Sequence, residues 1–140
     1  MEHTAPRTVT SERVPAVRLL RAGALAALLS ASVNTLVLAI ASSLFGPVVI
    51  PLDEAVTIGQ VMGASAAGAI GAAVVFAAVS RLTRRSIFVF WGIAAVGLLL
   101  SFIPIALAGA TGSSAGTLAL MHVVAAATNV GLLTRLGRKE

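Results

Sequence analysis

Charged residues divide the chain into three long apolar stretches. No Asp, Glu, Lys or Arg occurs in residues 22–52, 55–80 or 86–134. A helix needs about 20 consecutive apolar residues to cross the hydrocarbon core of a bilayer. Each of the first two stretches suits one crossing, whereas the third is about twice as long as one crossing requires. We therefore expect the third stretch to fold back on itself once.

Small residues mark the place where the third stretch is expected to turn. Residues 109–116 read Gly-Ala-Thr-Gly-Ser-Ser-Ala-Gly and interrupt a run of branched and aromatic side chains. The pattern thus predicts an all-α membrane protein, a bundle of four transmembrane helices within residues 18–136. Flexible tails are expected at 1–17 and 137–140. The four expected helices cover about residues 19–45, 56–82, 87–108 and 116–136.

The composition argues against a water-soluble domain. Hydrophobic residues make up 58% of the chain and charged residues 11%, whereas about a quarter of a soluble domain is charged. The absence of cysteine excludes disulfides and thiolate metal sites. The basic residues flank the apolar stretches instead of gathering on a soluble face, so nucleic acid is not an expected partner. The expected surroundings are a lipid bilayer.

The distribution of cations predicts the orientation of the bundle. Lys and Arg close to membrane segments are retained on the cytoplasmic side. In a four-pass arrangement all ten cations fall on one side: Arg7, Arg13, Arg18, Arg21, Arg81, Arg84, Arg85, Arg135, Arg138 and Lys139. Asp53 and Glu54 are the only charges on the other side. We therefore expect both termini in the cytoplasm. The excess of Arg over Lys is typical of GC-rich bacterial genomes, so a bacterial origin is expected.

A cleaved signal peptide is the alternative interpretation of the first helix. Arginines precede an apolar run that ends near Ala39-Ile40-Ala41, a small-residue pattern typical of cleavage sites. That run is close to 20 residues long, whereas the apolar core of a signal peptide has about 7–15. An uncleaved helix is therefore the expectation.

The second expected helix carries a ladder of small residues, Gly59, Gly63, Ala67 and Gly71. Small residues spaced by four let membrane helices approach closely. The ladder is interpreted either as packing within the bundle, which we favour, or as an interface with a second copy or another membrane protein. In the third expected helix, Pro104 removes a backbone donor and predicts a bend.

Few strongly polar side chains interrupt the apolar helices. Asn34, Gln60, His122 and Asn129 are candidates for an intramembrane polar pocket, because such groups usually face the interior of a bundle. Asp53 and Glu54 would stand at its outer mouth. Imidazole can change charge near neutral pH, which makes His122 the natural proton carrier or ligand contact. The alternative is a hydrogen-bond network that only joins the helices.

Catalytic motifs are absent from the sequence. There is no HExxH, no GxSxG and no Gly-rich phosphate loop with Lys, and no intramembrane acid or base accompanies His122. Asp53 and Glu54 with His122 would form at most a weak cation site. No enzymatic activity, cofactor or metal is therefore expected.

Two short motifs carry a resemblance to a known family. The run Leu-Met-His-Val-Val-Ala-Ala at 120–126 and Arg-Leu-Thr-Arg-Arg at 81–85 resemble an uncharacterised family of small four-helix actinobacterial membrane proteins, catalogued as a domain of unknown function. The resemblance implies a compact four-helix membrane domain and no particular activity. Small multidrug transporters are similar in length, but they depend on an acidic residue in the first helix, where this chain has Asn34.

The sequence favours a non-enzymatic multipass protein of the bacterial plasma membrane. The small-residue ladder suits an accessory or interaction subunit, with a homo-oligomer or another membrane protein as partner. The alternative function is a small-solute carrier or channel whose polar pocket opens to the cell exterior.

Overall fold

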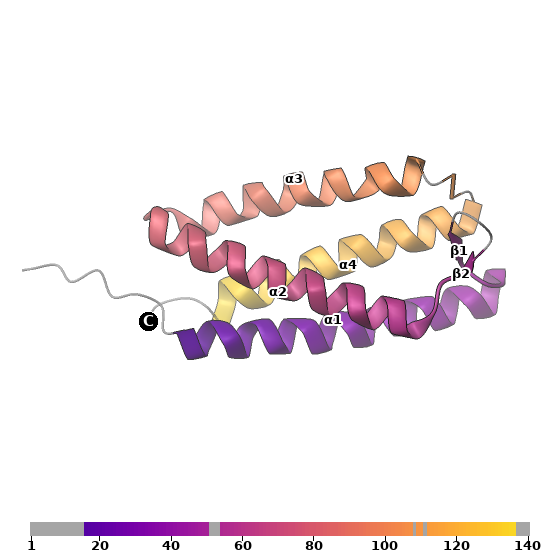
Figure 1. Ribbon diagram of the computed structural model, residues 1–140, viewed down its shortest axis with the longest axis horizontal. Helices are drawn as coiled ribbons and strands as arrows, with labels where there is room; N and C mark the ends of the chain where they lie inside the picture. Colours follow the sequence, from indigo (N-terminus) through magenta and orange to yellow (C-terminus); the bar gives the residue numbers. More distant parts are fainter. Residues whose placement is uncertain (1–15, 51–53, 108, 111, 137–140) are drawn as a thin grey trace, which may run out of the picture.

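Four long helices joined by short connections form the chain (Figure 1). The computed structural model describes residues 16–50, 54–107, 109–110 and 112–136. The helices are α1 (Ala16–Phe45), α2 (Ile58–Leu82), α3 (Ser86–Leu107) and α4 (Gly112–Leu136). Each is long and apolar enough to cross a membrane. The prediction of an all-α fold with four such helices is confirmed.

Two helices begin earlier than the sequence pattern predicts. Helix α1 starts at Ala16, inside the segment expected to be a tail, and α4 starts at Gly112 instead of residue 116. The first turns of α4 tolerate small polar residues because Thr117 Oγ1 donates to Ser113 O at 2.8 Å, which keeps the hydroxyl satisfied within the helix. The predictions for residues 1–15 and 137–140 lie outside the described residues.

A short β-hairpin, which the sequence analysis does not predict, connects α1 to α2. Strand β1 (Val49–Ile50) pairs antiparallel with β2 (Glu54–Ala55). The hairpin is tied to α4 because the backbone N–H of Val49 donates to Ser114 Oγ at 3.2 Å. We call this end of the bundle the hairpin end, and the opposite end, with residues 81–85, the arginine end (Figure 1).

Helix α1 contacts α2 and α4 through a stripe of mostly small residues. Gly23 shows how close the helices come, because a Cβ placed on it would lie 3.3 Å from Ala73 Cβ. The small side chains therefore allow both neighbours to pack directly against the α1 backbone. The buried residues of α1 are Ala22, Ala26, Ser30, Asn34, Leu38 and Ala41.

Two apolar clusters lie at the two ends of the bundle. Ala22, Phe76, Phe90, Val130 and Leu133 form the cluster at the arginine end. Leu38, Ala41, Val48, Val61 and Met121 form the cluster at the hairpin end. The buried polar residues of α1 lie between these two clusters along the helix.

Helix α3 lies at the edge of the bundle. Phe90 is its one buried residue among those described, and the Phe90 ring packs against Phe76 with centroids 4.9 Å apart. Towards the hairpin end α3 separates from α2 (Figure 1). The helix continues through Pro104 to Leu107, and the bend at Pro104 stays a prediction. Ser101 Oγ donates to Leu98 O at 2.6 Å and not to the carbonyl that Pro104 leaves free.

Candidate functional site

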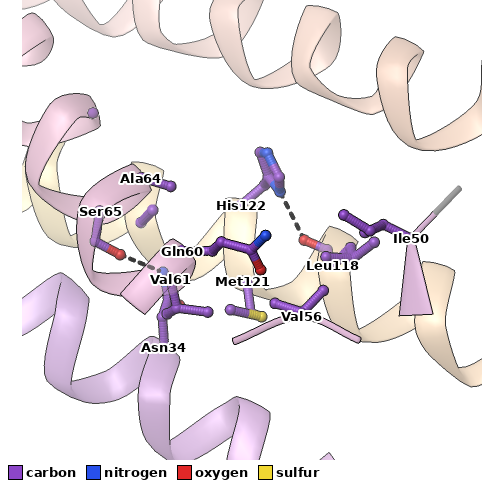
Figure 2. Close-up of a pocket in the computed structure, with 12 residues that line it drawn as sticks. Asn34, Ile50, Val56, Gln60, Val61, Ala64, Ser65, Leu118, Met121 and His122 are labelled. Carbon is purple, nitrogen blue, oxygen red and sulfur yellow. Dashed lines mark hydrogen bonds between the residues drawn. The ribbon is translucent and has the colours of Figure 1, made fainter. Parts of the chain in front are cut away.

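A pocket of about 520 Å³ lies near the hairpin end, between α2 and α4. Its polar lining residues are Asn34, Gln60, Ser65 and His122, and apolar side chains from the hairpin, α2 and α4 supply most of the rest. Figure 2 shows Asn34 on the α1 side of the pocket and His122 on the side that faces α3. Helix α3 itself contributes no residue to the lining. The structure thus brings three of the four predicted pocket residues to one pocket.

Asn34 anchors the inner side of this pocket. Its Nδ2 donates to Ser65 Oγ of α2 at 3.3 Å, and the two residues are only 4% and 5% exposed. The other atom of the same amide, Oδ1, is buried and has no hydrogen-bond partner among the described residues. Asn34 therefore joins two helices and lines the pocket, while its Oδ1 is an unused acceptor enclosed by the described residues.

His122 is half-buried and projects from α4 (Figure 2). Its Nδ1 lies 2.8 Å from Leu118 O, one turn earlier in the same helix. A carbonyl oxygen only accepts, so Nδ1 carries the proton of this bond, and Nε2 of the neutral ring is an acceptor. Within the described part of the chain, no residue of another helix forms a hydrogen bond with the ring.

Gln60 has a different role from the one predicted. It lies in the first turn of α2 and is exposed. Thr57 and Gln60 form a capping box: Thr57 N donates to Gln60 Oε1 at 2.8 Å, and Gln60 N donates to Thr57 Oγ1 at 3.3 Å. The Thr-x-x-Gln spacing was the signal for this cap. Gln60 borders the pocket, but its oxygen serves the backbone of α2.

Asn129 is not among the residues that line the pocket. It is buried against α2, where its Nδ2 would lie 3.9 Å from a Cβ on Gly68. Asn129 Oδ1 and Ser30 Oγ have no hydrogen-bond partner among the described residues. Within this part of the chain, Asn34 and Ser65 provide the one side-chain hydrogen bond between helices, so the network interpretation fails for the other polar residues.

The expected acidic mouth is described only in part. Glu54 is exposed on β2 at the hairpin end, whereas Asp53 lies outside the described residues. Residues 16–50, 54–107, 109–110 and 112–136 hold no group of three or more His, Asp or Glu that would bind a metal ion.

The small-residue ladder of α2 does not pack within the chain. Gly59, Gly63, Ala67 and Gly71 are all exposed, and a Cβ added to Gly63 or Gly71 would meet no atom within 4 Å. The favoured interpretation, packing inside the bundle, is therefore wrong. The reason is that α2 buries its opposite side, whose members are Val61, Ser65, Ala69, Phe76 and Val79.

Comparison with known proteins gives one match. The sequence profile of DUF6069, described as a family of unknown function, matches residues 14–139. No curated protein and no solved structure matches the chain. The matched segment contains all four helices, and the match confirms the resemblance to a domain of unknown function. The chain therefore belongs to the DUF6069 family of unknown function.

Proposed function

We propose that the protein crosses the bacterial plasma membrane four times, with both termini in the cytoplasm. The cations of the described residues support this orientation, since they all lie at the arginine end: Arg18, Arg21, Arg81, Arg84, Arg85 and Arg135. At the hairpin end the described part of the chain carries one charge, that of Glu54. Cationic residues beside membrane helices favour the cytoplasmic side.

We infer further that the protein acts as a non-enzymatic accessory subunit, which works by contact with a second copy or another membrane protein. The observation that carries this function is the exposed ladder of Gly59, Gly63, Ala67 and Gly71 on the side of α2 turned away from the bundle. In lipid, such a surface gains from a close helix contact, because small residues allow backbone approach and dispersion attraction.

Substitution of Gly63 tests this function directly. Gly63→Leu should abolish association, because the leucine fills the space that a partner helix would occupy, while the stability of the monomer should not fall. Gly97→Leu on α3 is the matched control, since a Cβ on Gly97 also meets nothing within 4 Å. Association is measured by disulfide cross-linking of Gly59→Cys in native membranes and by mass in mild detergent.

The outcomes distinguish the ladder of α2 from the exposed surface of α3. Cross-linking that disappears with Gly63→Leu and persists with Gly97→Leu supports the ladder as the interface. If the Gly59→Cys protein cross-links to no copy of itself and to no other membrane protein, or if Gly63→Leu changes nothing, the ladder faces lipid and the accessory function is wrong.

A small-solute carrier is the second candidate, and the polar pocket at the hairpin end favours it. Transport also needs a route to the arginine end. The apolar cluster that includes Phe76, Phe90 and Leu133 occupies that end of the bundle. This arrangement favours the accessory function.

A further inference from the structure

Polar groups in the lining of the pocket at the hairpin end have hydrogen-bond acceptors without a donor among the described residues. Asn34 Oδ1 is enclosed without a partner in this part of the chain, although Nδ2 of the same amide donates to Ser65. His122 commits Nδ1 to Leu118 O, so the neutral ring presents Nε2 as an acceptor. A buried acceptor without a donor is unfavourable. The natural occupant is a molecule that donates hydrogen bonds.

The other lining residues and the volume of the pocket indicate the polarity, charge and size of the ligand. Ile50, Val56, Leu118 and Met121 supply apolar surface, and none of the described residues in the lining is Asp, Glu, Lys or Arg. An ion would lose its water here without meeting an opposite charge, which is costly. The volume of about 520 Å³ suits a small organic molecule, because ligand pockets measure about 300–1,000 Å³.

We propose that the pocket binds a small uncharged amphipathic molecule, with a hydroxyl group directed at His122 Nε2, on the polar part of the lining that includes Asn34, and an apolar body against the hairpin and α4. The molecule reaches the pocket from the bilayer, on the side where α3 separates from the bundle and lines nothing. This route rests on the proposed membrane location, whereas the recognition chemistry does not.

Photolabelling locates the site. The protein in lipid nanodiscs is irradiated with a decanol analogue that carries a diazirine, and adducts are mapped by mass spectrometry. We expect saturable labelling within 56–68 and 118–125, displaced by decanol but not by decyl methyl ether, which lacks the hydroxyl donor. Labelling spread over the exposed face of α3, or displaced equally by alcohol and ether, would overturn the proposal.

Two variants test the acceptors. His122→Phe keeps an aromatic ring but removes Nε2, and we expect decanol to compete roughly five- to tenfold less well, the effect of one lost hydrogen bond. His122→Gln, which retains an acceptor, should restore part of the preference for the alcohol. Asn34→Leu removes the amide from the polar part of the lining and should weaken competition similarly. An unchanged preference in both His122→Phe and Asn34→Leu would refute the site.

The experiment also separates this proposal from the proposed membrane location. The same labelling is carried out in detergent micelles, where no bilayer is present. Alcohol-specific labelling in micelles, combined with a failed topology test, would contradict the membrane orientation and leave the pocket intact. Loss of alcohol specificity in both micelles and nanodiscs would refute the pocket, whatever the topology.

Discussion

At the scale of single residues, some buried polar side chains have hydrogen-bond partners and others have none among the described residues. The Asn34 amide and the Ser65 hydroxyl join α1 to α2 by one hydrogen bond of 3.3 Å. Ser30 lies one turn from Asn34 on the same buried stripe, and its hydroxyl has no partner among the described residues. Two buried serines are thus expected to have opposite effects on stability, because only Ser65 completes a hydrogen bond with another helix.

A matched pair of serine substitutions tests this contrast. Ser65→Ala should lower the free energy of unfolding by about 1–2 kcal/mol, because it leaves the buried Asn34 Nδ2 without an acceptor. Ser30→Ala removes an unpartnered hydroxyl and should leave stability unchanged or raise it by up to about 1 kcal/mol. Both values come from reversible unfolding in mixed micelles. Equal losses for the two variants would show that Ser30 has a hydrogen-bond partner in solution.

At the scale of elements, the four helices contribute unequally to the core. Helix α1 is central, and its small residues hold α2 and α4 close to its backbone. Helix α3 joins the bundle through Phe90, whose ring packs against Phe76 of α2 with an interplanar angle of 60°. The tilted arrangement is one that aromatic pairs prefer. The attachment of α3 therefore depends on the arginine end.

Two phenylalanines of α3 provide the corresponding test. Phe90→Ala should lower the free energy of unfolding by about 2–4 kcal/mol, because it removes a buried ring from the contact with Phe76. Phe88→Ala, which truncates a ring that is 79% exposed, should change it by less than about 0.5 kcal/mol. Unfolding in detergent followed by circular dichroism measures both. A larger loss for Phe88→Ala would mean that another face of α3 attaches to the bundle.

At the scale of the whole molecule, periodicity and charge were enough to predict four apolar helices in the right places. The sequence did not predict which face of each helix is buried. Both α1 and α2 carry a stripe of small residues. The stripe of α1 is buried inside the bundle, whereas the ladder of α2 that includes Gly63 is exposed, and this difference depends on tertiary packing. Gln60 was misassigned because hydropathy does not reveal a cap, although the spacing from Thr57 does.

The hairpin and the pocket were beyond prediction for a physical reason. Strands β1 and β2 are two residues each, too short for an alternating pattern to be recognised. The pocket depends on how far α2 and α4 stand apart beneath the hairpin, which is a property of packing. Asn34 and His122 were recognisable as polar groups in apolar helices, but the hydrogen bond from His122 to Leu118 O is visible only in the structure.

The proposed topology crosses the membrane four times with the arginine end in the cytoplasm, and thiol accessibility in intact cells tests this topology. The chain contains no cysteine, so Glu54→Cys and Arg84→Cys each introduce one reporter, at the hairpin end and at the arginine end. We predict that an impermeant thiol reagent labels Glu54→Cys in intact cells and labels Arg84→Cys only after permeabilisation. Labelling of Arg84→Cys but not Glu54→Cys in intact cells would reverse the orientation, and labelling of both would contradict the four-pass topology itself.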